Sequence, residues 1–321
     1  MRRFLFNLLL LFCMPACMRE ELPVPAHATG DVRIGSVSLG ASYEYQVFID
    51  LETNSEVARN QRTDWILAFE ASETGSLARL NTSLMLSAWN TGLDDFTSVS
   101  GSGGFETGKA WDAPSGNPDS VALVDWKSGK VHVIDLGYDK NGVKLGFAKL
   151  QFMEVSPSGY KIRWGKLADR EGAEIVICKD PLYNYIHMDH LGNMVPVEPP
   201  KDNWDLVFTQ YTHMFTDMTP VMPYLLTGCL INSNDTWVGR TNMAFDDIDY
   251  EFALGVGLEG SIDFIGYDWK EYSFDTDSYV VYPEITYIIK NHKGLYYKFH
   301  FLDFYDSMGV KGNPTWELQK L

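Results

Sequence analysis

The chain has 321 residues and a formal net charge of −17 at pH 7, with 43 Asp and Glu against 26 Lys and Arg. A hydrophobic content of 45% and an aromatic content of 14% exclude an intrinsically disordered chain, and the length suffices for two cores. The acidic balance excludes a nucleic-acid partner and attachment to anionic lipid through a basic patch.

The first predicted element is a targeting segment. Arg2 and Arg3 precede an apolar run at residues 4–12, which is too short to span a bilayer and is typical of a signal peptide. The run leads to Ala16 and Cys17, which resemble a bacterial lipoprotein cleavage site. We therefore expect a signal peptide at residues 1–16 and lipidation of Cys17; a secretory signal cut elsewhere is the alternative.

Residues 17–30 would form a lipidated tether. Residues 18–21 (Met-Arg-Glu-Glu) resemble a surface-export signal of Gram-negative lipoproteins. No later apolar stretch is long enough to span a membrane. We expect an outer-membrane lipoprotein, exposed on the cell surface and held at the membrane by its lipid anchor alone.

The rest of the chain has the pattern of β-strands. Residues 130–134 and 279–282 are rich in β-branched and aromatic side chains, which favour strands. Between such runs lie short Gly, Pro, Asn and Asp clusters that predict hairpin turns, at residues 139–142, 157–159, 190–193 and 292–294. No window has the period and the caps of a long helix.

One pattern of residues occurs twice. Tyr43, Tyr45 and Asp50 match Tyr183, Tyr185 and Asp189; residues 65–69 match 204–208, residues 79–81 match 230–232, residues 94–96 match 245–247, and residues 149–154 match 298–303. A repeat of half the chain length is too long for a solenoid. It predicts an all-β fold of two tandem related antiparallel β domains, at residues 31–169 and 170–321.

Two cysteines remain once Cys13 is removed with the signal and Cys17 is lipidated. Cys178 and Cys229 both lie in apolar, strand-like runs. An envelope location permits a disulfide between them, and two buried thiols are the alternative. The chain has no CxxC pair, so the sequence does not indicate a zinc or redox site of that type.

The second half resembles the HmuY family of outer-membrane lipoproteins. The resemblance rests on Trp204-Asp-Leu-Val-Phe208, on the run from Tyr287 to Phe304, and on Gly309, Gly312, Pro314 and Trp316. It is strong from Asp180 to Leu321 and weak over residues 31–169. It implies an all-β fold that captures haem between two axial His or Met side chains and passes it to an outer-membrane receptor.

The family's ligand positions do not carry ligands in this sequence. One family ligand lies a few residues after a strand tryptophan, and the local match beginning at Trp269 places Phe274 there. The other lies before that tryptophan, where residues 245–268 contain neither His nor Met. Phenylalanine cannot ligate iron, so a haem site in this chain requires other residues.

The candidate haem ligands are His213, Met214, Met218 and Met222. Haem iron takes His or Met ligands within apolar and aromatic walls, and this stretch lies beside Tyr211 and Tyr224. The alternative is that these methionines fill gaps in a core. Apart from haem iron, no metal site is expected.

The chain is predicted not to be an enzyme. It has no GxSxG or HExxH motif and no paired carboxylates of catalytic type. The predicted function is that of a surface lipoprotein of HmuY type that captures haem. The alternative is an interaction module that binds a glycan or a partner protein, with haem ligation lost.

Overall fold

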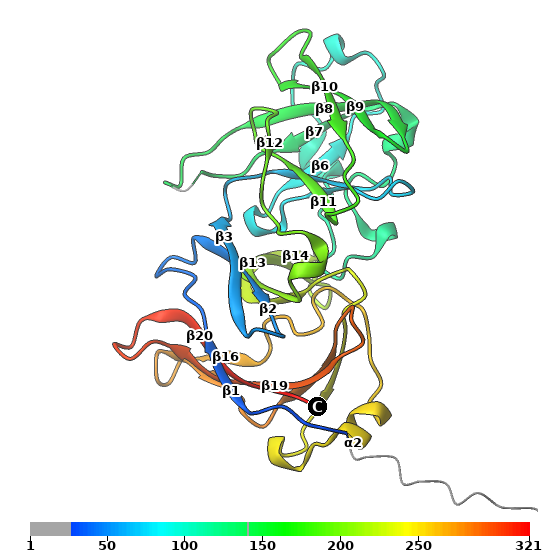
Figure 1. The fold of residues 1–321 in the computed structure, drawn as a ribbon. Coiled ribbons are helices and arrows are strands. Elements are labelled where there is room, and N and C mark those ends of the chain that lie inside the picture. Colours follow the sequence, from blue (N-terminus) through cyan, green and yellow to red (C-terminus); the bar gives the residue numbers. More distant parts are fainter. Residues whose placement is uncertain (1–26, 140) are drawn as a thin grey trace, which may run out of the picture.

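The computed structural model describes residues 27–139 and 141–321, and it is nearly all β. The signal peptide, Cys17 and the greater part of the tether lie outside the described residues. Figure 1 shows two lobes, and the chain begins in one, passes through the other and returns. We call residues 64–199 the central lobe, and residues 27–61 with 204–321 the terminal lobe.

The central lobe holds two antiparallel sheets. The larger has the order β10-β9-β8-β7-β6 and the smaller the order β12-β11-β4-β5. Their strands are β4 (Leu67–Glu70), β5 (Ala78–Leu80), β6 (Ser87–Asn90), β7 (Val131–Asp135), β8 (Phe147–Ser156), β9 (Gly159–Lys166), β10 (Ala173–Cys178), β11 (Tyr185–Met188) and β12 (Met194–Val195). The connections carry η1 (Thr82–Leu84), η2 (Phe96–Ser98), α1 (Phe105–Gly108), η3 (Pro118–Ser120) and η4 (Trp126–Ser128).

The terminal lobe also has a five-stranded sheet, of order β1-β20-β19-β18-β15, and a four-stranded sheet, of order β3-β2-β13-β14. In addition it has a two-stranded sheet of β16 and β17. Its strands are β1 (Arg33–Ser36), β2 (Tyr45–Asp50), β3 (Ser55–Gln61), β13 (Leu206–Phe215), β14 (Met222–Ile231), β15 (Trp237–Thr241), β16 (Lys270–Ser273), β17 (Ser278–Val281), β18 (Thr286–Lys290), β19 (Tyr296–Tyr305) and β20 (Lys311–Lys320). Its helices are η6 (Phe245–Asp247) and α2 (Tyr250–Gly255), and η5 (Lys201–Asn203) lies in the connection from the central lobe.

The two lobes repeat one plan, strand by strand. In chain order β4 to β9 of the central lobe correspond to β13, β14, β15, β18, β19 and β20, and β10 to β12 correspond to β1 to β3. The N-terminal strands thus complete the terminal lobe: β1 pairs with β20, and β2 pairs with β13.

Repeated residues make repeated hydrogen bonds. The Asn81 amide donates to the carbonyls of Arg62 and Trp65, and the Asn232 amide donates to those of Lys201 and Trp204. In each lobe a side-chain amide therefore fastens the segment that leads into the tryptophan strand. The sequence repeat is a repeat of structural roles.

A buried lysine is repeated in the same way. Lys149 Nζ donates to the carbonyls of Phe96 and Val99, and Lys298 Nζ donates to those of Phe245 and Ile248. Both ammonium groups also lie over a phenylalanine ring, of Phe96 or Phe245. Each lysine thereby satisfies the carbonyls of a 3₁₀ turn that covers its sheet.

Each lobe has its own core. In the terminal lobe Phe208, Phe301 and Trp316 pack with β2, and in the central lobe Phe69, Phe152 and Trp164 pack together. A smaller cluster, which includes Trp65 and Trp204, joins the two lobes. β1–β3 belong to the terminal lobe, so the strand pairing favours dividing the chain into residues 64–199 and residues 27–61 with 204–321. The predicted division between residues 169 and 170 stays a prediction.

Three of the predicted turns lie at hairpin connections, and the two cysteines lie on separate strands. Residues 157–159, 190–193 and 292–294 lie at hairpin connections, and Gly192 and Gly294 have the positive φ that such turns require. Cys178 is exposed on β10 and Cys229 is buried on β14, and both are free thiols. The two do not form a disulfide.

Candidate functional site

The four predicted haem ligands lie at the far end of the β13–β14 hairpin. His213 pairs with Tyr224, Met214 with Pro223 and Phe215 with Met222. Side chains that are directly opposite on paired strands share a face, and successive residues alternate between faces. His213 and Met222 therefore lie on one face, and Met214 lies on the other.

The His213 face is aromatic. The His213 ring centroid lies 4.9 Å from that of Phe215 and 5.1 Å from that of Tyr267. Its Nδ1 is buried without a hydrogen-bond partner in the described structure. The imidazole is free to ligate, but two neighbouring residues on one face, such as His213 and Met222, cannot hold iron from opposite sides of a porphyrin.

Met218 lies outside both faces. It is 43% exposed in the turn between β13 and β14, which contains the cis peptide bond between Thr219 and Pro220. The structure therefore brings His213 and Met222 onto one face and separates them from Met214 and Met218. The four candidates do not form one ligand set.

The opposite face of the hairpin borders a cleft between the lobes. The cleft has a volume of about 600 Å³, within the range of cofactor sites. Thr212, on the Met214 face, donates a 2.5 Å hydrogen bond to the Thr82 carbonyl, which ties this face to the central lobe. The cleft is lined by Arg62, Leu84, Met85, Ser87, Lys109, Trp111, Asp135, Gly137, Tyr138, Asp139, Gly142, Pro223 and Leu225.

Met85 is the potential iron ligand on the central-lobe wall. It follows η1, has a φ of 56° and is 38% exposed. A bulky residue in the left-handed region is unusual, and such conformations concentrate at functional sites. On the terminal-lobe side the cleft is lined by Pro223 and Leu225, and Met214 pairs with Pro223 but does not itself line the cleft. No signal in the sequence distinguishes Met85, because its exposure comes from the turn.

The cleft also holds charged groups of both signs. Arg62 donates from a terminal nitrogen to the Ser83 carbonyl, but its buried Nε has no partner among the described residues. Burial lowers the pKa of Arg62. Lys109 pairs with Glu106 at 2.6 Å and lies near the Trp111 ring, while Asp135 lies 3.9 Å from Lys144. The Arg62 Nε is thus an unused donor for an anionic ligand group.

The family's ligand position is unsuitable here for a second reason. Phe274 is 90% exposed after β16, at the tip of the two-stranded sheet. The preceding Trp269 is buried and stacks on Phe301 at 3.7 Å. The tryptophan therefore belongs to the core, and the residue at the ligand position points away from any enclosed cavity.

Two other histidines, His132 and His300, are paired with carboxylates. His132 Nε2 lies 2.8 Å from Asp125 Oδ1, and His300 Nε2 lies 2.7 Å from Glu317 Oε2. Within the described residues no group of three or more His, Cys, Asp or Glu side chains could hold a metal ion.

The fold is all-β, and the comparisons give the family of the chain. A family model described as HmuY protein matches residues 42–318. The chain belongs to the HmuY family, and the match extends over both sequence repeats. HmuY proteins are in general binding proteins.

The chain is also similar to two solved structures. The apo HmuY analog from Tannerella forsythia is 10% identical, with 92% of this chain and 98% of that chain covered and a TM-score of 0.33. Apo PinO from Porphyromonas gingivitis is 12% identical, with 91% and 98% covered and a TM-score of 0.33. No curated protein matches.

Proposed function

We propose that this protein captures haem, without catalysing a reaction, in the cleft between its lobes. The observation that carries the proposal is the cleft itself: it has cofactor size, a lining of mixed polarity that includes the aromatic residues Trp111 and Tyr138, and a strained, exposed methionine on its central-lobe wall. Membership of the HmuY family supports the same ligand.

The residues present fit a haem. Met85 would supply one thioether from the central lobe, and Met214, the strand partner of the cleft residue Pro223, would supply the second from the terminal lobe. Trp111 and Tyr138 would supply flat walls, and Arg62 and Lys109 would hold the propionates. Asp135 and Asp139 line the same cleft and would repel propionates, so the propionates would lie next to Arg62 or Lys109 and away from these two carboxylates. Two methionine ligands would stabilise ferrous over ferric haem.

The experiment is a titration with haemin, with and without dithionite, followed by the Soret band. Met85→Ala and Met214→Ala should each shift the band and weaken binding by at least about tenfold, because each removes a proposed iron ligand. Met218→Ala is the matched control, since this exposed methionine lies in the turn, and it should bind as the wild type does.

Two outcomes would overturn this assignment. A wild-type protein that gives no sharp Soret band in either oxidation state does not capture haem. Loss of the band in His213→Ala, with Met85→Ala and Met214→Ala unaffected, moves the site to the aromatic face of the hairpin. His213 and Met222 would then be the residues to test next.

We also propose that Cys17 is acylated and that the protein faces outward from the outer membrane, where haem can be passed to a receptor. Among the described residues, no helix is long and apolar enough to cross a membrane. Cys17→Ser should move the protein from the membrane fraction to the soluble fraction without changing its melting temperature. Detergent-dependent partitioning of this variant would contradict the anchor.

Exposed apolar side chains favour a second candidate function, docking of a partner protein. Phe274 is 90% exposed and Met308 is 83% exposed, at the tips of two hairpins that are joined by a hydrogen bond from the Tyr279 amide to the Tyr305 hydroxyl. Loss of receptor or cell-surface partner binding in Phe274→Ser and Met308→Ser, with haem binding unchanged, would support it. A glycan partner would show the same loss in a glycan-binding assay.

A further inference from the structure

A second pocket, smaller than the cleft, lies beside β11 and the proline-rich segment at residues 195–200. Its volume is about 280 Å³. Its walls are almost entirely apolar or aromatic, and the charged side chain among them is Glu198. It is lined by Tyr183, Tyr185, Ile186, His187, Met194, Val195, Pro196, Val197, Glu198 and Pro200.

Glu198 has no cationic partner. Its carboxylate accepts hydrogen bonds from the Tyr185 amide at 2.7 Å and from the Asn184 side chain at 3.5 Å, both neutral donors. In the described part of the chain it forms no ion pair, and burial raises its pKa to about 7. The charge of a half-buried carboxylate is normally balanced by a nearby cation. The Glu198 carboxylate is therefore available to pair with a cationic ligand.

Two basic side chains that contact or line the pocket residues, Arg79 and His187, do not fill that role. Arg79 donates from Nε to the Tyr185 hydroxyl at 3.0 Å and from a terminal nitrogen to the Gly116 carbonyl. His187 lies edge-on to Trp65, and burial lowers its pKa to about 3, so it stays uncharged. Arg79 therefore holds the Tyr185 ring in place, and His187 acts as a neutral wall.

The repeat shows that this is a specialised position. His187 on β11 corresponds to Phe48 on β2, since His187 pairs with Ala68 of one tryptophan strand and Phe48 with Val207 of the other. Phe48 lies edge-on to Trp204 at 5.0 Å, as His187 does to Trp65 at 4.7 Å. One lobe thus has an apolar ring where the other has a ring that can also accept a hydrogen bond.

We propose that this pocket binds a small organic ammonium ion, with Glu198 as its counter-ion and the Tyr183 and Tyr185 rings as its walls. Aromatic faces attract alkylammonium groups through their quadrupole, and a carboxylate at the same site adds charge complementarity. The net charge of −17 raises the local concentration of cations around the protein. This site is independent of the haem proposal.

The experiment compares a cation with its uncharged analogue of the same shape. Choline chloride and 3,3-dimethylbutan-1-ol are titrated into the wild-type protein at pH 8 by calorimetry and by ligand-observed NMR. Choline should bind at least about tenfold more tightly than the alcohol. Equal binding of the two overturns the proposal, and this comparison needs no variant.

Two variants then locate the site. Glu198→Gln keeps the shape and the hydrogen-bond acceptor but removes the charge, and it should weaken choline binding at least about tenfold. Glu171→Gln changes an exposed carboxylate that does not line the pocket, and it should leave binding unchanged. Choline affinity retained in Glu198→Gln overturns the assignment. N-acetyl-lysine methylamide as a third probe separates a free ammonium ion from a partner's lysine.

Discussion

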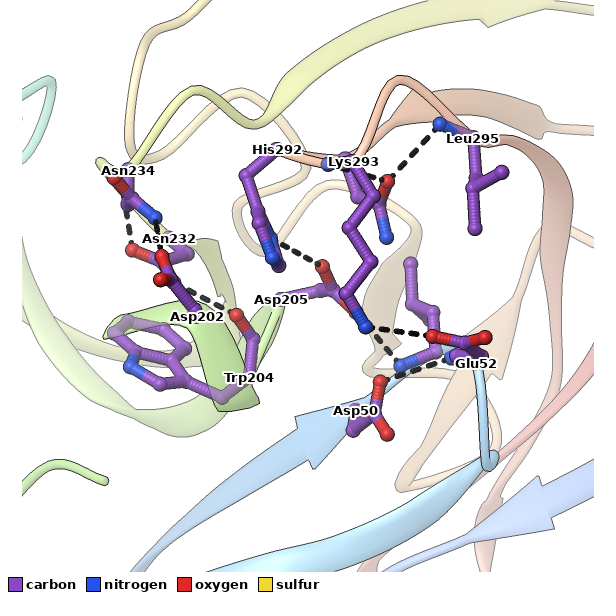
Figure 2. A network of polar contacts seen from close by, with 12 residues as sticks. Asp50, Glu52, Asp202, Trp204, Asp205, Asn232, Asn234, His292, Lys293 and Leu295 are labelled. Atoms are coloured by element: carbon purple, nitrogen blue, oxygen red, sulfur yellow. Dashed lines mark hydrogen bonds and ion pairs between the residues drawn. The ribbon is translucent and has the colours of Figure 1, made fainter. Parts of the chain in front are cut away.

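Asp205 Oδ1 and His292 Nδ1 lie 3.9 Å apart in the terminal lobe, and neither atom has a hydrogen-bond partner in the described structure. Figure 2 shows the two side chains directed at each other beneath the β18–β19 turn. The other Asp205 oxygen accepts a hydrogen bond from the Leu51 amide at 2.8 Å. The equivalent position of the central lobe is the buried Ile66.

Burial raises the pKa of Asp205 to about 6, from the ordinary value of 3.8, and Asp50 and His292 are the titratable groups that act on it. Because the folded state holds the proton more tightly than the unfolded state, stability should fall as the pH rises from about 4 to about 6. Asp205→Asn keeps an acceptor for Leu51 and cannot ionise. It should raise the free energy of unfolding at pH 7.5 by about 1–3 kcal/mol and reduce that slope.

Urea unfolding at pH 4 and pH 7.5 checks this prediction. Asp119→Asn is the control, because Asp119 is exposed. If the wild type and Asp205→Asn show the same dependence of stability on pH, then Asp205 does not carry a buried proton.

The strand pairing predicts which fragments fold. Residues 62–200 contain both sheets and the core of the central lobe, so this fragment should give a β circular dichroism spectrum and a cooperative melt. Residues 170–321 lack β1 and β2, the partners of β20 and β13, and should not fold alone.

Complementation separates the two ways of dividing the chain. A peptide of residues 27–61 should bind and order a fragment of residues 204–321, because it restores two edge pairings and part of the core. A fragment of residues 170–321 that melts cooperatively without this peptide would instead place the folding boundary at residues 169 and 170.

The repeat was predictable from sequence because the repeated residues have the same structural roles in each lobe, as Asn81 and Asn232 do. The exchange of N-terminal strands was not predictable. β2 and β11 carry the same pattern, so each would suit either tryptophan strand, and the choice depends on tertiary packing.

The candidate site was predictable only in part. The Met-rich segment was found from its composition, and it does lie on one long hairpin. Alternation along β13, however, separates His213 from Met214, and the cleft wall that carries Met85 comes from a turn in a distant part of the chain. Met85 has no sequence signal, since its exposure depends on a left-handed φ and on the neighbouring lobe.

The buried lysines provide a prediction about stability. Lys298→Met removes hydrogen bonds of 2.6 and 3.0 Å to the Phe245 and Ile248 carbonyls. The Phe245 carbonyl then keeps only the 3.4 Å hydrogen bond from the Ile248 amide, and the Ile248 carbonyl loses its donor among the described residues. The free energy of unfolding should fall by about 2–4 kcal/mol, because a buried unsatisfied carbonyl adds to the lost charged hydrogen bonds.

Chemical denaturation measures the effect, and the central lobe supplies a parallel case. Lys149→Met should destabilise by a similar amount, since Lys149 makes the same two contacts with Phe96 and Val99. Lys161→Met is the control: the Lys161 side chain is 39% exposed in a surface pair with Glu174, and the loss of this pair should change stability by less than about 1 kcal/mol. Equal effects of all three variants would contradict a specific role for the two buried lysines, Lys149 and Lys298.

The last prediction concerns the rate of haem capture. A net charge of −17 repels the two haem propionates at long range, so association should be slow at low ionic strength and should accelerate several-fold between about 20 and 300 mM NaCl, as screening shortens the range of the repulsion. Arg62 and Lys109 act in the opposite sense within the cleft, where screening is weaker. Lys109→Gln should therefore increase the dissociation rate and leave the salt dependence of association nearly unchanged. Stopped-flow mixing followed at the Soret band measures both rates, and association that slows with added salt would show that the local cations, rather than the net charge, govern the approach of haem.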